Sequence, residues 1–210
     1  MISDPDFSAT QREVVLVDNG GFVVGSMPKN LVHSINTPLH LGFSVYVFND
    51  RSQLLMTRRS RIKATWPGVW SNSFCGHPSP GETFYNAIER RAQQELAIDV
   101  ESITPILTRS RYSCEMPNGV RENEICPVFR ALTTEEPRLN LTEVESAMWI
   151  DWVTATAQLF ISPWARFQID ELCKLGAPEE WPTGNWNSLP ATKVTGIDSF
   201  RCGGSEFFKI

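Results

Sequence analysis

The sequence is poor in the features that mark membrane proteins, secreted proteins and nucleic-acid-binding proteins. No segment approaches the roughly 20 consecutive apolar residues that a transmembrane helix requires. Residues 1–12 are polar and acidic and lack the pattern of a signal peptide, so we expect a cytoplasmic protein. The formal net charge of −5 argues against general binding to nucleic acid. Neither a membrane nor a nucleic acid is therefore expected as a partner, and we expect a monomer or a weak homodimer.

Cysteine is scarce as well. The five cysteines are odd in number and widely spaced, which predicts reduced thiols and argues against a disulfide framework or a CxxC site. Cys75 stands out because glycine follows it directly and His77 lies two positions further on. A thiol near a cation or a basic group ionises more readily and can act as a base or a nucleophile. The other four are interpreted as small buried hydrophobic residues: Cys114, Cys126, Cys173 and Cys202.

The 41% of hydrophobic residues is enough for a core without disulfides, and the local patterns favour a single α+β domain. Turn residues separate several strand-like runs, and two segments have helical spacing of apolar residues. Strands are predicted at 13–18, 22–27, 43–48, 53–58, 103–109, 124–130 and 146–152, and helices at 83–96 and 163–175. Tryptophan, proline and glycine accumulate from residue 177 onward. We therefore expect one domain over residues 1–176 and an irregular C-terminal tail over residues 177–210 that packs on this domain or extends from it.

The three histidines of the chain and two nearby carboxylates form a candidate metal site. His33 and His40 bracket a loop-like segment, and His77 lies between Gly76 and Pro78, which break regular structure. Residues two apart on a strand project to the same face, so the side chains of Glu122 and Glu124 can point to one place. Three imidazoles and two carboxylates suit Mn²⁺, Fe²⁺ or Zn²⁺, and also Mg²⁺. Scattered histidines beside an exposed acidic strand end explain the same residues, and both interpretations stay open.

Basic residues gather in one part of this acidic chain. Arg58, Arg59, Arg61 and Lys63 precede an aromatic segment, and Lys29 lies four residues before His33. A cationic cluster near a metal site suits a ligand that carries phosphate, because arginine binds phosphate with two parallel hydrogen bonds. A solvated hairpin end is the alternative explanation for these charges.

Residues 76–98 have the spacing of the Nudix box, a loop-helix-loop that binds a metal diphosphate. Arg91 and Gln94 stand where that motif has acidic residues, and Ala97 replaces its usual glycine. Glu95 is the one metal-binding carboxylate that remains at the end of the helix. An ordinary ion pair between Arg91 and Glu95, four residues apart on one helix face, is the simpler interpretation of those two residues.

Together these segments resemble the type I isopentenyl-diphosphate isomerases, a branch of the Nudix fold. The resemblance covers about residues 14–175 and rests on an ordered series of motifs. These are Lys29 and His33, PLHL at 38–41, TRR at 57–59, WPGVW at 66–70, SNSFCGHP at 71–78, Arg111 and Tyr112, ENEICPV at 122–128, and SPW at 162–164. The family's fold implies mixed and antiparallel β-sheets packed between helices.

The resemblance also implies an activity in isoprene biosynthesis. Members of the family interconvert isopentenyl diphosphate and dimethylallyl diphosphate by protonation and deprotonation through a tertiary carbocation. The family's catalytic residues correspond to Cys75 and Glu124 as the acid–base pair, Tyr112 as a hydrogen-bond partner of Glu124, and Trp164 as the residue that closes the pocket. One divalent cation, Mn²⁺, Zn²⁺ or Mg²⁺, would be held by His33, His40, His77, Glu122 and Glu124. Glu95 would hold Mg²⁺ against the diphosphate, whose oxygens would contact Lys29, Arg59, Lys63 and Arg91.

Three rival functions make different predictions. A Nudix hydrolase needs several glutamates on the box helix to bind ions and activate water, and residues 90–95 keep one. A binding module without activity would lack at least one of the catalytic residues, and none is missing. A structural zinc domain would have closely paired ligands, which the histidines do not provide. We therefore expect an isomerase.

Overall fold

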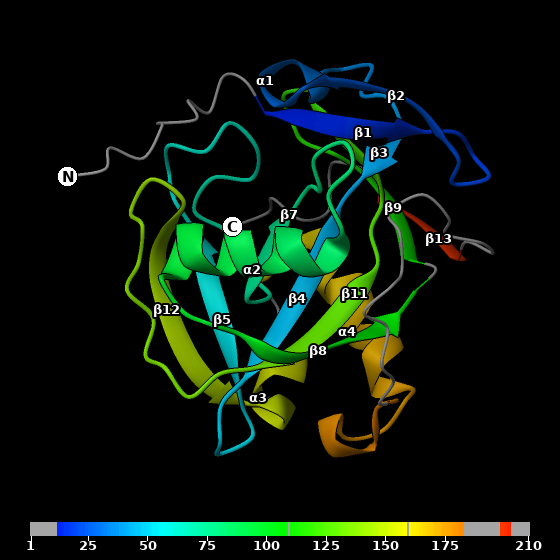
Figure 1. Cartoon of the computed structure of the whole chain (residues 1–210). Helices are drawn as coiled ribbons and strands as arrows, with labels where there is room; N and C mark the ends of the chain where they lie inside the picture. The colour runs from blue at the N-terminus through cyan, green and yellow to red at the C-terminus, as the bar shows by residue number, and fades with distance from the viewer. Residues whose placement is uncertain (1–11, 109, 159, 183–197, 203–210) are drawn as a thin grey trace.

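The computed structural model describes residues 12–182, except residues 109 and 159, together with residues 198–202. The described strands form two sheets (Figure 1). A seven-stranded sheet runs in the order β12 (Val144–Asp151), β5 (Gln53–Arg59), β4 (Phe43–Phe48), β11 (Val128–Leu132) and β8 (Glu101–Leu107), with β6 (Trp70–Ser71) beside β5 and β7 (Phe74–Gly76) beside β4. A six-stranded sheet runs in the order β13 (Asp198–Cys202), β9 (Ser110–Glu115), β10 (Arg121–Ile125), β3 (His40–Leu41), β1 (Glu13–Val17) and β2 (Val23–Pro28).

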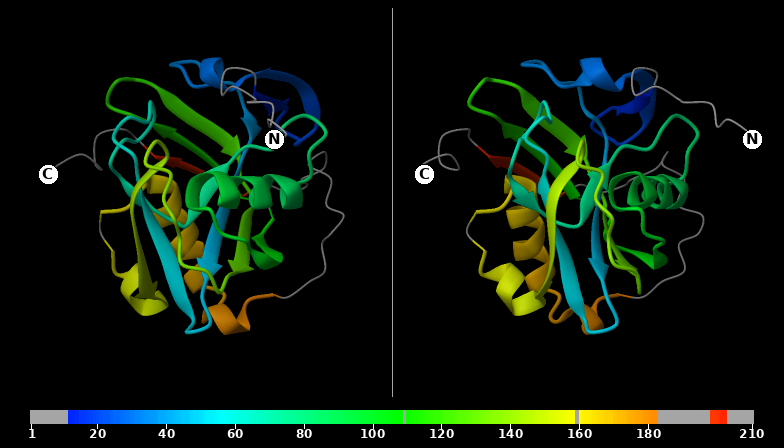
Figure 2. Two further views of the ribbon diagram at one scale, coloured as in Figure 1. Left: turned by 60° about the vertical axis from the view of Figure 1, so that its left-hand side comes forward. Right: turned by 90° about the vertical axis from the view of Figure 1, so that its left-hand side faces the viewer.

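Helices cover both faces of the seven-stranded sheet. Helix α2 (Phe84–Leu96) lies on one face, and α3 (Trp152–Thr156) and α4 (Pro163–Cys173) lie on the other (Figure 2). The remaining short helices are α1 (Lys29–Val32) and the 3₁₀ turn η2 (Pro178–Glu180). None of the described helices is long and apolar enough to span a membrane.

Local sequence explains where the two long helices begin and end. The hydroxyl of Thr83 accepts a hydrogen bond from the backbone of Asn86 and so caps α2. Ser162 caps α4 in the same way, with Pro163 in the first turn. Helix α2 ends at Ala97 in the left-handed conformation, with φ of 50°, where the related motif has glycine. Both helices were predicted from sequence, and the structure confirms them.

Strand β4 divides the core into two layers. All six of its residues are buried, as expected for a central strand that pairs in parallel with β11. Phe43, Val45 and Val47 pack in the layer that α2 covers. Tyr46 and Phe48 point the other way, into the layer that α4 covers. Because β4 follows β3 after Gly42 alone, the same chain segment links the two sheets.

The predicted strand at 124–130 is wrong, because two strands occupy that region. Strand β10 ends at Ile125 in one sheet and β11 begins at Val128 in the other. Pro127 has no N–H to give to a sheet, and its carbonyl accepts a hydrogen bond from Ser44 as the chain crosses over. The predicted hairpins at 13–27 and 43–58 are confirmed as antiparallel pairs.

The C-terminal tail is more regular than predicted. Trp181 is buried against Phe48 and Trp152. Strand β13 pairs in parallel with β9, so the prediction of an irregular tail is wrong for residues 198–202. The rest of the tail beyond residue 182 lies outside the described residues.

Two of the predictions about cysteine are also wrong. Cys114 is disulfide-bonded, although reduced thiols were expected. The register of β9 and β13 sets the backbone of Cys202 opposite Cys114, a proximity that widely spaced cysteines do not reveal in a sequence. Cys173 is exposed near the end of α4 instead of buried. Cys75 and Cys126 are free.

Candidate active site

A cavity of about 370 Å³ is lined by residues of both sheets, of α2 and of α4. Every residue singled out from the sequence as a site residue lines it except His40, whose imidazole is fully buried. The lining side chains include His33, His77, Glu122, Glu124, Cys75, Tyr112, Trp164, Lys29, Arg59, Lys63, Arg91 and Glu95. Elements far apart in the sequence therefore converge on one pocket.

Three imidazoles and one carboxylate form a tight cluster in this cavity. The ring centroids of His33, His40 and His77 lie 5.1–5.7 Å from one another. One ligand atom from each ring and one from Glu124 all lie within 4.8 Å of one another. The parallel pairing of β3 and β10 sets His40 directly opposite Glu124, which fixes the strand-borne part of the cluster.

The nitrogens of this cluster are prepared to bind a cation. The Nδ1 of His40 lies 2.9 Å from the carbonyl oxygen of Pro38, so Nδ1 carries a proton and Nε2 is the nitrogen that faces the cluster. Nδ1 of His77 is buried without a hydrogen-bond partner among the described residues, and Nε2 of His33 and Nε2 of His40 face carboxylate oxygens of Glu122 and Glu124. Buried polar atoms are normally paired, and a metal ion is a partner that suits several imidazoles at once. The donor set therefore fits a divalent cation.

Glu122 and Glu124 occupy different positions relative to the cluster. Both carboxylates are buried on the same face of β10, as the spacing predicts. Glu124 Oε1 lies 3.0 Å from His77 Nε2 and 3.4 Å from His40 Nε2. Glu122 Oε2 lies 2.7 Å from His33 Nε2. Glu124 thus belongs to the central cluster, and Glu122 joins it through His33.

The carboxylate of Glu124 is ionised in this surrounding. Burial would raise its pKa, but the His77 and His40 imidazoles outweigh burial and hold the pKa well below its usual range. Gly42 makes room for the group, because a Cβ at that position would collide with the carboxylate oxygens. A larger residue in the β3–β4 link would therefore force this carboxylate to shift.

The pKa of the Cys75 thiol is shifted in the opposite direction. Burial raises its pKa to about 11, so the sulfur keeps its proton at neutral pH. Ser44 Oγ and Asn72 Oδ1 both lie 3.3 Å from the sulfur. The pocket therefore contains a neutral thiol and an ionised carboxylate, one able to give a proton and one able to take it.

Aromatic rings form one wall of the pocket. Tyr112 and Trp164 are stacked, with ring centroids 6.0 Å apart and an interplanar angle of 24°. The guanidinium of Arg59 lies 5.7 Å from the centre of the Trp164 ring. The expected hydrogen bond from Tyr112 to Glu124 is not formed in the described part of the chain. The two residues are opposite one another on β9 and β10, but the tyrosine ring packs on the indole instead.

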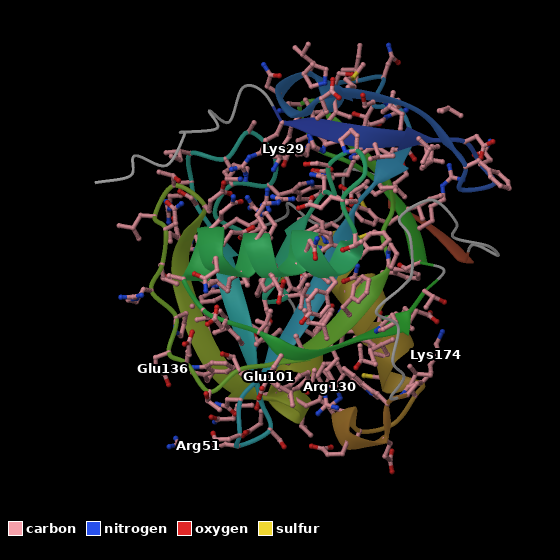
Figure 3. All side chains as sticks on the ribbon, in the orientation of Figure 1. Lys29, Arg51, Glu101, Arg130, Glu136 and Lys174 are labelled. Atoms are coloured by element: carbon pink, nitrogen blue, oxygen red, sulfur yellow. The ribbon has the colours of Figure 1, made fainter. Side chains whose placement is uncertain are left out.

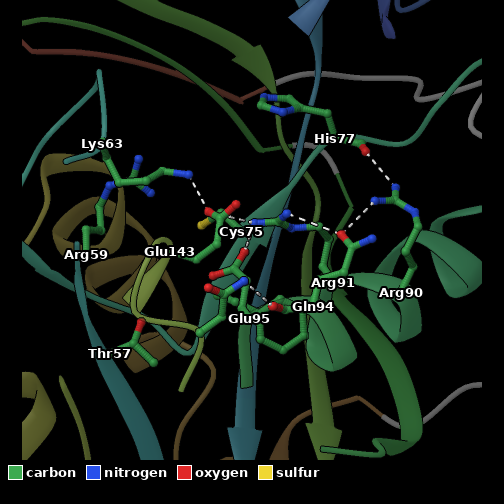
Figure 4. Close-up of polar contacts among 12 residues, drawn as sticks. Thr57, Arg59, Lys63, Cys75, His77, Arg90, Arg91, Gln94, Glu95 and Glu143 are labelled. Atoms are coloured by element: carbon green, nitrogen blue, oxygen red, sulfur yellow. Dashed lines mark hydrogen bonds and ion pairs between the residues drawn. The ribbon is translucent and has the colours of Figure 1, made fainter. Parts of the chain in front are cut away.

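Cations and carboxylates alternate on the other wall (Figure 4). Glu143 pairs with Lys63 and lies 3.3 Å from Nη2 of Arg91, which also pairs with Glu95. Arg91 and Glu95 are both buried, although ion pairs on helix surfaces are usually exposed.

Lys29 lies between the β1–β2 hairpin and α2, whereas Arg51 and Lys174 lie at the periphery of the molecule (Figure 3).

Lys29 and Glu143 have pKa values that burial and neighbouring charges shift. Burial, with the positive charges of Arg91 and Lys63, lowers the pKa of Lys29 to about 7. Burial would raise the pKa of Glu143, but Arg91 and Lys63 lower it to about 2. The wall therefore contains an excess of positive charge that an anion with several charges would balance.

Sequence reasoning missed two residues of this site. Glu143 lies just before β12, and nothing in its neighbourhood marks it, because its partners are about 80 and 52 residues away. Asn72 lies within the SNSFCGHP motif but was given no role, although its amide contacts Cys75 and Trp164. An isolated glutamate and a buried asparagine carry no periodic signal that a sequence alone would reveal.

The chain is similar to known proteins along most of its length. Residues 38–171 match the NUDIX domain family. A protein of Saccharopolyspora erythraea named isopentenyl-diphosphate Delta-isomerase is 49% identical over 87% of this chain and 97% of its own. A protein of Rhizobium rhizogenes with the same name is 45% identical over 88% of this chain and 92% of its own.

Solved structures agree on the fold. The crystal structure of DR0079 from Deinococcus radiodurans covers 76% of this chain and 98% of its own, with a TM-score of 0.57 and 19% identity. A MutT protein from Methanosarcina mazei covers 67% of this chain and 97% of its own, with a TM-score of 0.54 and 17% identity. At these identities the two structures establish the architecture alone.

Proposed function

Because the chain belongs to the isopentenyl-diphosphate Delta-isomerase family of NUDIX-domain proteins, we propose that Cys75 and Glu124 are the proton-transfer pair of an isomerase. The reaction interconverts isopentenyl diphosphate and dimethylallyl diphosphate, which differ in the position of one double bond. One carbon must gain a proton and a different carbon must lose one. The observation that carries the proposal is that Cys75 and Glu124 line one pocket, where burial raises the pKa of the thiol and the histidines lower the pKa of the carboxylate.

The chemistry requires both groups together. An alkene is a weak base, so its protonation gives a tertiary carbocation of high energy. The π electrons form the new C–H bond, and loss of a proton from the neighbouring methylene to the second group forms the new double bond. General acid–base catalysis of this kind needs each group within reach of its carbon. Cys75 on β7 and Glu124 on β10 come from different sheets, an origin that suits groups on two sides of a flat five-carbon chain.

The cation between the two transfers needs stabilisation without a nucleophile. The face of an indole ring is negative, and a desolvated cation–π contact is worth about 2 kcal/mol. Trp164 is buried, lines the pocket and is held in place by Tyr112 and Trp66. Water would trap the cation as an alcohol, so the enclosing aromatic wall also protects the intermediate.

The histidine cluster is the proposed holder of a divalent cation. His33, His40, His77 and Glu124 would be its direct ligands, with Glu122 beside His33. A bound cation would fix the position of the Glu124 carboxylate and change its affinity for protons. Mn²⁺, Zn²⁺ and Mg²⁺ are the ions we propose to test, because imidazole and carboxylate ligands accept all three.

The basic wall is the proposed diphosphate site. Lys29, Arg59, Lys63 and Arg91 would contact the diphosphate oxygens, and Glu95 would hold a Mg²⁺ that accompanies them. Arginine and lysine bind phosphate well in a buried site because little water competes. Gln94 accepts hydrogen bonds from Arg12, Arg90 and Arg91 instead of presenting a carboxylate, so α2 lacks the acidic cluster that NUDIX hydrolysis needs.

One incubation separates isomerisation from hydrolysis. The purified protein with isopentenyl diphosphate, Mg²⁺ and Mn²⁺ in D₂O is followed by proton and phosphorus NMR. We expect dimethylallyl diphosphate with deuterium at its allylic carbons and an intact diphosphate. Release of inorganic phosphate without a shift of the double bond would instead assign the chain to hydrolysis.

A further inference from the structure

Asn72 is a fully buried residue in the link between β6 and β7, three positions before Cys75. Its Nδ2 donates hydrogen bonds to the carbonyl oxygens of Val45, at 3.0 Å, and Phe74, at 2.8 Å. Carbonyl oxygens only accept, so both hydrogens of the amide are in use. The orientation of the amide is therefore fixed, and Oδ1 faces Cys75 and Trp164, which line the pocket.

Oδ1 of Asn72 is the meeting point of three donors. It accepts from Ser71 Oγ at 2.7 Å, from Trp164 Nε1 at 3.2 Å and from Cys75 Sγ at 3.3 Å. An indole N–H can only donate, which independently requires the oxygen, and not the nitrogen, at this position. One buried oxygen thus contacts both the proposed proton-transfer sulfur and the proposed cation-stabilising ring.

A second buried chain holds the opposite side of the sulfur. The hydroxyl of Tyr46 donates to Gln168 Oε1 at 3.1 Å, and Gln168 Nε2 donates to Ser44 Oγ at 2.9 Å. Ser44 Oγ lies 3.3 Å from Cys75 Sγ and 3.4 Å from Cys126 Sγ. The sulfur of Cys75 is therefore held between a hydroxyl and an amide oxygen, each fixed by partners of its own.

We propose that Asn72 is a positioning residue for isomerisation, whose Oδ1 fixes the Cys75 thiol and the Trp164 indole relative to one another. The inference rests on the proposed function of that pair. Proton transfer to a carbon falls steeply when the donor moves away from it, so losing the shared oxygen lowers the rate of the chemical step. Among the described residues, Asn72 has no hydrogen bond with the groups proposed to bind the diphosphate, so we expect substrate affinity to change little.

The test compares Asn72→Leu with Thr57→Val. Leucine keeps the number and branching of the side-chain heavy atoms but removes the Oδ1 acceptor together with the Nδ2 donor. Thr57 is buried and donates to the carbonyl oxygens of Asn72, at 3.1 Å, and Ser73, at 2.9 Å, so its valine variant disturbs the same loop and spares the amide. We expect Asn72→Leu to lower kcat by at least about tenfold with KM within about twofold, and Thr57→Val to leave both within about twofold. Equal kcat values in the two variants would overturn the proposal.

A second variant gives a readout that does not depend on activity. Asn72→Ser shortens the side chain, so its hydroxyl no longer reaches both Cys75 and Trp164. The positions of Cys75 Sγ and Trp164 Nε1 are compared in crystal structures of the variants and the wild type without substrate. We expect these two atoms to move relative to one another by about 1 Å or more in Asn72→Leu and Asn72→Ser and to stay in place in Thr57→Val. Unchanged positions in the Asn72 variants would refute the positioning role, even if the wild type proved not to be an isomerase, and Asn72→Ser gives the result if Asn72→Leu does not fold.

Discussion

At the scale of single residues, burial and neighbouring groups favour the protonation states that the chemistry needs. The thiol of Cys75 is kept neutral because its thiolate would be poorly solvated, and Glu124 is kept ionised because imidazoles surround it. Both are also the states of the free side chains at neutral pH, and the surroundings shift each pKa further in the same direction. The same reasoning makes two other residues of the pocket testable by pH.

Lys29 is expected to make substrate binding depend on pH. Its pKa of about 7 means that the free protein carries this charge below pH 7 and loses it above. Binding a diphosphate anion restores the proton, so KM should rise as pH increases from 7 to 9, by up to about tenfold per unit. Lys29→Arg keeps its charge throughout and should show a flat KM over this range. The measurement is steady-state kinetics of the wild type and Lys29→Arg at pH 6–9. Parallel profiles of KM against pH would contradict the assignment of this pH dependence to Lys29.

Glu143 is expected to stabilise the fold at neutral pH. Its folded-state pKa of about 2 lies below the ordinary value of 4.5. Its contribution is therefore fully present above pH 4.5 and is lost as pH falls from 4.5 toward 2. Glu143→Gln should lower the free energy of unfolding by roughly 1.5–3 kcal/mol at pH 7, the range for hydrogen bonds to charged groups. Urea unfolding at pH 7, 4.5 and 3 should show the difference shrink with acid, and a constant difference would refute the ion-pair explanation.

At the scale of elements, the sequence predicted the long, strongly patterned segments but not where the chain crosses between sheets or which distant strands pair. The α2 and α4 helices carry caps and apolar stripes, which are local signals. The break between β10 and β11 depends on which sheet each half joins, and the run from Glu124 to Arg130 looks like one strand. The pairing of β13 with β9 is likewise a long-range event. The residues predicted for the site belong to motifs that resemble those of the family, and most of them line one pocket, whereas Glu143 and Asn72 act through contacts that only the fold creates.

Gly42, the residue that links β3 to β4, allows a further prediction. Gly42→Ala adds a Cβ that collides with the Glu124 carboxylate, so the carboxylate must leave the histidine cluster. Loss of one supporting interaction at a metal site typically costs about 10–100-fold in affinity, and we expect a loss in that range for Mn²⁺. Gly25→Ala on β2 is the matched control, because nothing lies within 4 Å of its added Cβ. Calorimetric Mn²⁺ titration of both variants is the measurement, and equal affinities would show that Gly42 is not required.

At the scale of the whole molecule, the pocket joins what the two sheets supply separately. The six-stranded sheet carries His40, Tyr112 and Glu124, and the seven-stranded sheet carries Arg59 and Cys75. Helix α2 adds Arg91 and Glu95 from one face, and α4 adds Trp164 from the other. A chain with a net charge of −5 thereby concentrates positive charge at one place, where a diphosphate would be attracted.

The most direct test of this account uses Cys75→Ala and Glu124→Gln beside the wild type. Each protein is incubated with isopentenyl diphosphate and Mg²⁺ in D₂O, product is followed by proton NMR, and diphosphate binding is measured by calorimetry. We predict that both variants bind the substrate yet convert it at least about 1,000-fold more slowly than the wild type, with no deuterium at the allylic carbons. Turnover at the wild-type rate in either variant would contradict the claim that a thiol and a carboxylate share the proton transfers.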